Sequence, residues 1–328
     1  MNYKKIFENK NKNETDVIKL KINPINQKNI LESNKFLENQ KNILESNKFL
    51  ENKNESYSDS NVFDANQRNN KQWLDFFNTN GYIILSNAIT PNQITKLKDE
   101  LYQVENKNKF KKVDLDRHLV HKCFFENSPT TISLIESSVL YDFAQQVIAD
   151  VPGGRGNTLT AHLIHNNAFI VPPGGRGQAP GFHTDDCLQN IIIENEKQLP
   201  DWIKLPVLAC TWMCWLSDCE DPSNGPTWVV PGSHRFGQIV DPVLAEKLAI
   251  PTCGKAGTCV LINNQLWHRG SANTSNIPRQ TLQLTFARRI IGHKHKTIMN
   301  YNMPTYVYAN KSDKVKERLG WLQGGAYS

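Results

Sequence analysis

His183-Thr184-Asp185 is the stretch that decides the fold of this chain, because it places an imidazole and a carboxylate two residues apart. In an extended strand, residues i and i+2 project from the same face, so His183 and Asp185 can bind one metal ion while Thr184 points away. A second imidazole, His268, must come from a distant strand. Two histidines and one carboxylate form the facial ligand set of non-haem Fe(II) oxygenases, which leaves three open coordination positions. Those positions suit a bidentate 2-oxo acid and O2, and the planar guanidinium of Arg279 suits the far carboxylate of 2-oxoglutarate.

Two longer segments surround this ligand set. They are Asn224-Gly225-Pro226-Thr227-Trp228-Val229-Val230-Pro231-Gly232-Ser233-His234 and Leu266-Trp267-His268-Arg269-Gly270-Ser271-Ala272-Asn273. Together with the H-x-D tripeptide they resemble the phytanoyl-CoA dioxygenase family of Fe(II)/2-oxoglutarate oxygenases. The resemblance extends from about Trp73 to Gln323, so an oxygenase domain is expected over residues 69–328.

The resemblance implies a role for several single residues. His183, Asp185 and His268 would be the iron ligands, Arg279 would bind 2-oxoglutarate, and Trp212 matches the family's strand tryptophan beside this cosubstrate. Fe(II), 2-oxoglutarate and O2 would all be required. Halogenating relatives replace the metal carboxylate by a small residue, so Asp185 speaks against halogenation.

Short strands divided by Gly, Pro and Asn follow a helical opening. Apolar residues at helical spacing predict a helix from Pro91 to about Glu105, with Thr90 and Gln93 as its capping box. A second helix is expected from about Ser138 to Ala149. The expected strands are Tyr82–Leu85, Thr158–Val171, Val207–Leu216, Thr227–Val230, Gly257–Ile262 and Gln280–Ile291. This pattern predicts a mainly β fold with helices on one face, a double-stranded β-helix or cupin-like jelly roll.

The last of these strands has an apolar and a polar side. Leu282, Leu284 and Phe286 share one side, while Arg279, Thr281, Gln283 and Thr285 share the other. If Arg279 points into the barrel to reach 2-oxoglutarate, the other residues on its side of the strand also point inward. The apolar side of the strand then faces the helices. Polar inward residues are costly in a sealed core and imply a ligand-filled cavity, so Thr281 and Gln283 are candidate substrate contacts.

The motif Pro-Gly-Gly-Arg-Gly occurs at Pro152–Gly156 and again at Pro173–Gly177. The second copy leads into the H-x-D tripeptide, which places Arg176 near the mouth of the barrel as a candidate anion-binding residue. Arg155, in the first copy, is a weaker candidate. The alternative is that both copies are solvated turns.

Other residues compete with the proposed ligands. Asp186 faces away from His183 in a regular strand, so a role beside the ligands or at a helix cap is expected for it. His234 is expected to be a structural hydrogen-bonding residue, because the facial set is complete without it. No spacing singles out His162, His165, His293 and His295.

Residues 1–68 have a different composition, rich in Asn, Lys, Glu and Ser, which favours a disordered or transiently helical arm. The 13-residue unit KNILESNKFLENQ at Lys28–Gln40 recurs almost unchanged at Lys41–Lys53. Two copies are too few for a solenoid. The unit is either a tandem duplication in a tolerated tail, which the composition favours, or a short helix that docks on a partner.

Composition excludes several classes of protein. No run of 18 apolar residues is present, and the N-terminus fits neither a secretory signal nor a transit peptide, so a cytoplasmic location is expected. The seven cysteines are expected to be free, and Cys210, Cys214 and Cys219 to be core thiols. The net charge of +6 is modest for a chain of this length, so nucleic acid binding has little support. The oligomeric state stays open.

The expected reaction is therefore the oxidation of a small molecule by hydroxylation, desaturation or oxidative ring closure. A small anionic metabolite, such as an amino-acid-derived natural product, is the first interpretation of the substrate. An acyl group on coenzyme A or a carrier protein is the alternative. A barrel that binds a ligand without turnover is a third class, which oxygen consumption with 2-oxoglutarate would separate from an enzyme.

Overall fold

The computed structural model describes residues 62–107, 119–151, 160–177, 181–185, 191–193, 198–200, 202–294 and 301–321. The chain divides into two compact units, Met1–Tyr57 and Ser58–Ser328, and all the described residues lie in the second unit. The predicted 13-residue repeat lies outside the described residues.

A seven-stranded sheet in the order β1-β2-β8-β5-β10-β4-β3 is the largest element of the fold. Its strands are β1 Val62–Asp64, β2 Tyr82–Ser86, β3 Leu119–Lys122, β4 Ala161–Val171, β5 Ala209–Trp215, β8 Cys259–Asn263 and β10 Arg279–Arg288. The smaller sheet has the order β7-β6-β9, with β7 Ile250–Pro251, β6 Trp228–Val229 and β9 His268–Arg269. Val229 of this sheet packs in one apolar cluster with Tyr82, Ile84, Val260 and Ile262 of the large sheet. The predicted jelly roll is confirmed.

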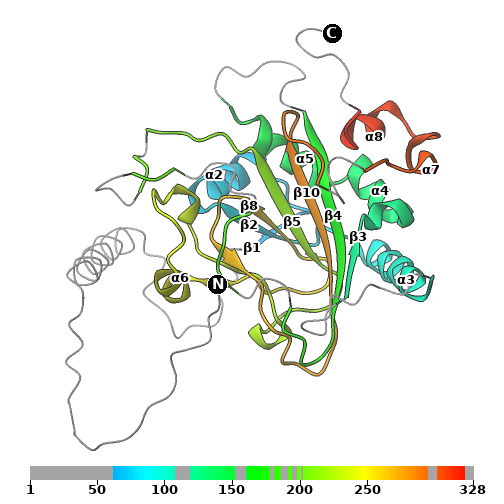
Figure 1. Ribbon diagram of the computed structural model, residues 1–328, viewed down its shortest axis with the longest axis horizontal. Helices are drawn as coiled ribbons and strands as arrows, with labels where there is room; N and C mark the ends of the chain where they lie inside the picture. Colours follow the sequence, from blue (N-terminus) through cyan, green and yellow to red (C-terminus); the bar gives the residue numbers. More distant parts are fainter. Residues whose placement is uncertain are drawn as a thin grey trace, which may run out of the picture. The chain divides into compact units, whose positions relative to one another are not determined.

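The other face of the large sheet is covered by helices (Figure 1). They are α2 Asn70–Asn80, α3 Pro91–Lys107, α4 Pro129–Glu136 and α5 Val139–Ala149. Leu282, Leu284 and Phe286 of β10 are fully buried in this layer, and the Phe286 ring lies 5.6 Å from that of Tyr141 in α5. The apolar side of β10 therefore faces the helices, as its alternation predicts. Shorter helices complete the described part: η2 Phe124–Asn127, η4 Pro222–Asn224, η5 Ser233–Arg235, α6 Pro242–Leu248, α7 Thr305–Tyr308 and α8 Asp313–Arg318.

Local signals in the sequence explain where the helices begin and end. The Thr90 backbone N–H donates to Oε1 of Gln93, and the Gln93 N–H donates to Oγ1 of Thr90, so the predicted capping box starts α3. Helix α2 ends at Gly81, whose φ of 76° is left-handed. A Cβ atom there would lie 2.4 Å from Nδ1 of His234, so close packing as well as backbone conformation requires glycine.

The large sheet begins earlier than the composition predicts. Val62, Phe63 and Asp64 pair in parallel with β2, and the Phe63 ring lies 5.2 Å from that of Phe76. Strand β1 lies before the boundary expected at residue 68. A three-residue strand leaves too little alternation to stand out from a polar segment. None of the helices in the described ranges is long and apolar enough to span a membrane. Cys210, Cys214 and Cys219 are buried free thiols, as predicted.

Candidate metal centre and cosubstrate site

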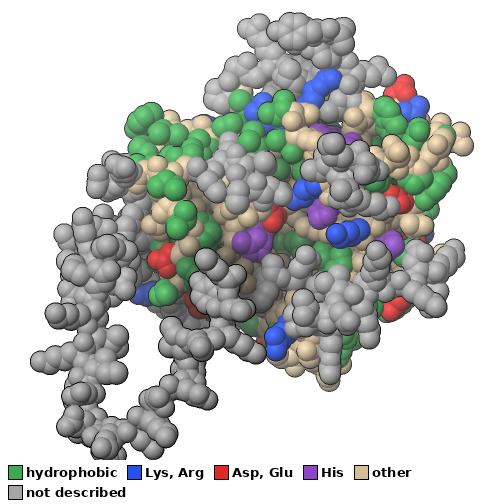
Figure 2. Space-filling model, viewed as in Figure 1, with side chains coloured by type: hydrophobic (Ala, Val, Ile, Leu, Met, Phe, Trp, Pro, Cys, Tyr) green, Lys and Arg blue, Asp and Glu red, His purple; other side chains and the backbone are tan. Residues whose placement is uncertain are grey.

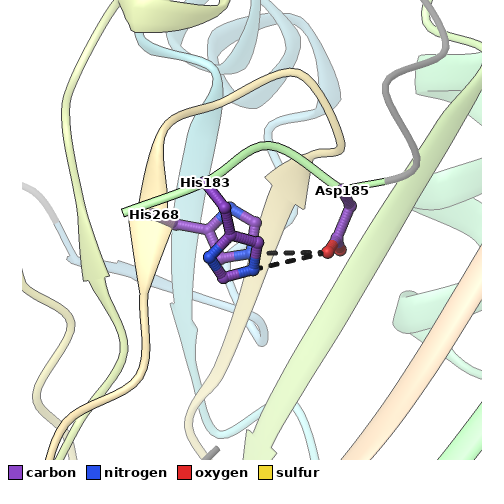
Figure 3. Close-up of side chains that lie close together, drawn as sticks. All are labelled: His183, Asp185 and His268. Atoms are coloured by element: carbon purple, nitrogen blue, oxygen red, sulfur yellow. Dashed lines mark ion pairs between the residues drawn. The ribbon is translucent and has the colours of Figure 1, made fainter. Parts of the chain in front are cut away.

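His183, Asp185 and His268 lie together at the edge of the smaller sheet, with both rings facing the carboxylate (Figure 3). Nε2 of His183 and Nε2 of His268 are 3.8 and 3.7 Å from Oδ1 of Asp185. Their ligand atoms lie within 4.8 Å of one another. The His268 side chain is 9% exposed, whereas that of His183 is 36% exposed. The cluster is therefore closed on the side of His268 and open to solvent on the side of His183.

Backbone hydrogen bonds hold the three residues in place. The N–H of His183 donates to the carbonyl of His268 and the N–H of His268 donates to that of His183, each at 3.0 Å. The Asp185 N–H donates to the Asn264 carbonyl at 2.8 Å, just after β8. The H-x-D tripeptide was expected in a strand, and the structure reduces that strand to one antiparallel bridge. His183 and Asp185, which are two positions apart, still point to the same side because the segment stays extended.

The tautomers of the two imidazoles follow from their second nitrogen atoms. Nδ1 of His183 lies 2.9 Å from the Gly181 carbonyl, and Nδ1 of His268 lies 2.8 Å from the Leu266 carbonyl. A carbonyl only accepts, so each Nδ1 carries the proton and each Nε2 keeps its lone pair directed at the shared point. Burial lowers the pKa of His268, although Asp185 opposes the shift. The neutral imidazole that a metal requires is thus favoured.

Hydrogen bonds through Asn264 connect the backbone of Asp185 to the large sheet. Thr285 of β10 and Thr211 of β5 place their Oγ1 atoms 3.1 Å apart, and Thr211 donates to Oδ1 of Asn264 at 3.0 Å. Asn264 in turn accepts the backbone N–H of Asp185. The polar side of β10 is therefore connected to the metal centre across the interior. No sequence pattern singles out Asn264, whereas the cross-strand parity of β5 and β10 places Thr211 on that side.

Arg279 is a buried cation, 9% exposed, at the start of β10. Its Nη1 donates to the Ser271 carbonyl at 3.2 Å, and its Nε has no hydrogen-bond partner among the described residues. Burial lowers its pKa, and no carboxylate of the described ranges pairs with it. A buried guanidinium without an anion fits a carboxylate ligand, because pairing restores what burial costs.

Two glycines make room for this guanidinium. A Cβ atom on Gly225 would lie 2.7 Å from Nη1 of Arg279, and one on Gly177 would lie 3.3 Å from Nη2. Both glycines have positive φ angles, 81° and 75°. Gly177 closes the second Pro-Gly-Gly-Arg-Gly motif and Gly225 belongs to the Asn-Gly-Pro segment. Both motifs thus shape the space around Arg279.

Residues 77–281 match the family model "Phytanoyl-CoA dioxygenase (PhyH)", which covers more than half of the chain. The chain belongs to the phytanoyl-CoA dioxygenase family. It is therefore an Fe(II)/2-oxoglutarate-dependent dioxygenase, as the resemblance implied. An uncharacterized protein of Mycobacterium tuberculosis is 22% identical over 255 residues, which cover 76% of this chain and 86% of the relative.

Solved structures share the fold of this family member at low identity. The 2-oxoglutarate-dependent carbocyclase SnoK from nogalamycin biosynthesis has a TM-score of 0.53 at 16% identity, and the match covers 71% of this chain and 89% of SnoK. HygX from Streptomyces hygroscopicus, with nickel and 2-oxoglutarate bound, has a TM-score of 0.52 at 14% identity over 67% of this chain and 88% of its own. EctD from S. alaskensis, with 2-oxoglutarate and 5-hydroxyectoine, has a TM-score of 0.51 at 19% identity, with 72% and 82% covered.

Trp212 lies in strand β5. It pairs with Leu284 across β5 and β10, so both side chains lie on the helix side of the large sheet. Its Nε1 donates to the Leu140 carbonyl of α5 at 2.8 Å, and the side chain is fully buried. The contact of Trp212 with 2-oxoglutarate stays a prediction, while its side chain faces the helix layer. Strand parity decides this, since Thr211 and Met213 occupy the inward positions on either side.

Thr281 and Gln283 have the inward orientation that the strand pattern predicts. Thr281 lies between Phe169 and Trp215 in the sheet, and its buried Oγ1 has no hydrogen-bond partner in the described part of the chain. Gln283 is paired with Asn167, whose Nδ2 donates to Oε1 of Gln283 at 2.8 Å. Oδ1 of Asn167 is buried and lacks a partner within the described ranges. Their roles toward a substrate stay predictions.

The two loop arginines differ in what the structure says of them. Arg176 is exposed, on a segment that is connected to the loop between β9 and β10: the Gly174 N–H donates to the Asn273 carbonyl, and the Asn273 N–H donates to the Gly175 carbonyl. It stays a candidate anion-binding residue. Arg155 lies outside the described residues, as do Asp186 and His295.

The remaining histidines have surroundings of their own. Nε2 of His234 lies 3.1 Å from the Asn78 carbonyl, and burial lowers its pKa to about 4, so it is a structural residue as predicted. His162 and His293 pack edge to face at 5.4 Å, away from the three clustered ligands. His165 lies 3.3 Å from Asn167 on the inward side of β4. Histidine side chains and charges of both signs are visible near the middle of the face in Figure 2.

Proposed function

We propose that His183, Asp185 and His268 bind the Fe(II) of this enzyme and that Arg279 binds the distal carboxylate of 2-oxoglutarate. The observation that carries the ligand assignment is the convergence of two Nε2 lone pairs on the Asp185 carboxylate, with both Nδ1 protons used by carbonyls. Two nitrogen atoms and one carboxylate suit Fe(II) and leave positions for 2-oxoglutarate and O2. Arg279 supplies the cation that a dicarboxylate needs at its other end.

Bound Fe(II) and 2-oxoglutarate supply the activation of O2, coupled to decarboxylation of 2-oxoglutarate to succinate and CO2 and to oxidation of a substrate C–H bond. The protein's contribution is position. Arg279 fixes one end of 2-oxoglutarate, and the Thr285-Thr211-Asn264 chain holds the backbone of Asp185 through the Asn264 carbonyl. The buried, dry environment of Arg279 strengthens its attraction for an anion.

We propose a small polar anion as the substrate, such as an amino-acid-derived metabolite, with Thr281, Gln283 and Arg176 among its contacts. The inward faces of β4 and β10 carry a hydroxyl and an amide oxygen that lack partners within the described ranges, Oγ1 of Thr281 and Oδ1 of Asn167. A ligand with hydroxyl or amino groups satisfies both atoms, whereas an alkyl chain leaves them buried and unpaired at a cost of about 1–3 kcal/mol each. The structures of HygX with hygromycin B and of EctD with 5-hydroxyectoine also contain polar small molecules.

The alternative substrate is an acyl group carried by coenzyme A or a carrier protein. The family's name supports it, because that name describes an acyl-CoA oxygenase. The polar interior between β4 and β10 weighs against it. The candidate reactions are hydroxylation, desaturation and ring closure of the substrate.

Succinate formation tests the proposal. The purified enzyme, supplied with Fe(II), ascorbate and 2-oxoglutarate, is incubated with a panel of polar carboxylates and a panel of acyl-CoA thioesters. Polar carboxylates are expected to raise succinate formation together with oxygen consumption, and mass spectrometry of the product separates hydroxylation from desaturation or ring closure. Stimulation by acyl-CoA thioesters alone would contradict the substrate assignment and leave the cosubstrate assignment standing.

A further inference from the structure

Arg269, the residue after His268, lies between two aromatic rings. Its guanidinium carbon is 5.1 Å from the centroid of the Phe182 ring and 5.0 Å from that of the Trp228 ring. Both distances are within the range of a cation–π interaction, and a guanidinium can stack on one ring with each of its faces. The Arg269 side chain is only 17% exposed, so solvent weakens these contacts little.

The register of the smaller sheet explains why these three side chains meet. His183 is paired with His268 across an antiparallel bridge, so the preceding residue, Phe182, stands opposite the following one, Arg269. On the other side of β9, Arg269 is paired with Trp228 of β6. Phe182, Arg269 and Trp228 therefore form one cross-strand row.

This row lies back to back with the metal centre. Val229, the partner of His268, packs against the large sheet, so the side chains of His268 and Val229 point inward. Neighbouring residues in a strand point to opposite faces, which places Arg269 and Trp228 on the outer face. The ring–cation–ring row thus joins, from behind, the two segments that carry His183 and His268.

The backbone pairing that the row reinforces is short. Among the described residues, one bridge with two hydrogen bonds of 3.0 Å connects the Phe182 segment to β9. Arg269 also forms an ion pair of 3.1 Å with Glu246 of α6, but the Glu246 side chain is 66% exposed, so this pair is screened by solvent. Nη1 of Arg269 donates to the Gly270 carbonyl at 3.4 Å, and its buried Nε has no hydrogen-bond partner among the described residues. The two rings are therefore the contacts that join this guanidinium to other strands.

We propose that Arg269 is a positioning residue that sets the affinity of the metal centre by clamping the Phe182–His183 segment onto β9. The inference rests on the proposed ligand set. The clamp fixes the separation of the His183 and His268 imidazoles. Among the described residues, their two segments are connected by one β-bridge. Removal of either ring or cation lets His183 move relative to His268, so the two Nε2 atoms no longer meet one ion at the same distance. Outer residues of this kind change metal affinity about 10- to 100-fold.

Titration of the metal-free, full-length enzyme with Ni(II), without 2-oxoglutarate, tests the proposal by calorimetry. Phe182→Tyr keeps the ring and is expected to bind Ni(II) like the wild type, whereas Phe182→Leu is expected to bind about ten-fold or more weakly. Arg269→Met, which keeps a long apolar side chain but loses the cation, is expected to match Phe182→Leu. Glu246→Gln, the control for the exposed ion pair, should stay within about two-fold of the wild type.

The melting temperature of each metal-free variant separates positioning from general stability. The leucine and methionine variants are expected to melt within about 3 °C of the wild type, because the row covers little core area. Equal Ni(II) affinity of Phe182→Leu and Phe182→Tyr overturns the proposal, and Arg269→Met gives the same test if Phe182→Leu does not fold. His268→Ala in the same titration isolates the ligand assignment. Unchanged Ni(II) affinity in His268→Ala refutes the proposed metal site itself. If His268→Ala loses Ni(II) affinity but Phe182→Leu does not, only the clamp is refuted.

Discussion

Gly225 and Arg279 are in such close contact that a Cβ atom at residue 225 would lie 2.7 Å from Nη1 of the arginine. The same Cβ atom would lie 2.8 Å from the Ala272 carbonyl oxygen, so the backbone offers no space on the other side. Gly225 also has a φ of 81°, which a side chain disfavours. The space that the guanidinium fills therefore depends on the absence of one methyl group.

Gly225→Ala is expected to push the Arg279 guanidinium away from its position and to raise the KM for 2-oxoglutarate about ten-fold or more, because a charge-assisted hydrogen bond is weakened. Steady-state kinetics with varied 2-oxoglutarate measure the effect. Gly292→Ala is the matched control, since nothing lies within 4 Å of a Cβ atom there. An unchanged KM in Gly225→Ala would mean that Arg279 does not bind the cosubstrate.

Arg279→Lys tests the role of the planar guanidinium directly. The lysine keeps the charge but loses the bidentate geometry, which costs about 1.5–3 kcal/mol, or roughly a 10- to 150-fold rise in the KM for 2-oxoglutarate. The substrate KM should change much less. Arg176→Ala is expected to show the reverse pattern if its loop binds the substrate's anion. Equal effects on both constants in both variants would contradict the separate roles.

His268→Ala is expected to remove the stabilisation that metal gives to the folded protein. A metal that binds only the folded state adds about 2.7 kcal/mol at a concentration 100 times its Kd. The melting temperature of the wild type should therefore rise with added Fe(II) under anaerobic conditions and fall back with a chelator. The variant should show neither change and no turnover. A metal-dependent rise of normal size in the variant would refute His268 as a ligand.

Truncation before and after β1 tests where the folded unit begins. A chain that starts at Ser58 retains β1, whereas one that starts at Arg68 loses the pairing of Val62–Asp64 with β2 and the contact of Phe63 with Phe76. The shorter chain is expected to melt several degrees lower, because about 1 kcal/mol or more of packing is lost. Thermal melting of the two truncated chains measures the difference. Equal melting temperatures would show that β1 contributes nothing to stability.

Acid is expected to destabilise the fold through buried His234. Burial lowers its pKa from 6.5 to about 4, so between these values the unfolded chain binds a proton that the folded chain does not. The stability that depends on neutral His234 is present above pH 6.5 and is lost as pH falls toward 4, on the order of 3 kcal/mol in total. Urea unfolding at several pH values should show this slope. His234→Asn, which still offers an N–H to the Asn78 carbonyl, should show a smaller slope than the wild type.

Much of the fold and of the site follows from sequence patterns that act locally. The H-x-D spacing places His183 and Asp185 on one side of any extended segment, and the alternation along β10 separates Leu282 and Leu284 from Arg279. Both patterns depend only on backbone geometry, so they are readable without the fold. The capping box of Thr90 and Gln93 is local in the same sense.

Trp212 shows where local information ends. Its type and position in an apolar strand fit either face of the sheet, and only the pairing with Leu284 in β10 decides for the helix side. Register is a relation between two strands distant in sequence, so the residues of one strand cannot specify it. The same is true of β1, which is recognisable only through its partner β2.

The sequence by itself determined the residue types of the proposed metal and cosubstrate sites and the alternating strands of a jelly roll. The tertiary structure decided which residues meet across strands: Thr211 with Thr285, Phe182 with Arg269, and the two glycines with the guanidinium of Arg279. The physical reason is that spacing along one strand is set by bond geometry, whereas contacts between strands depend on register and on the packing of two sheets.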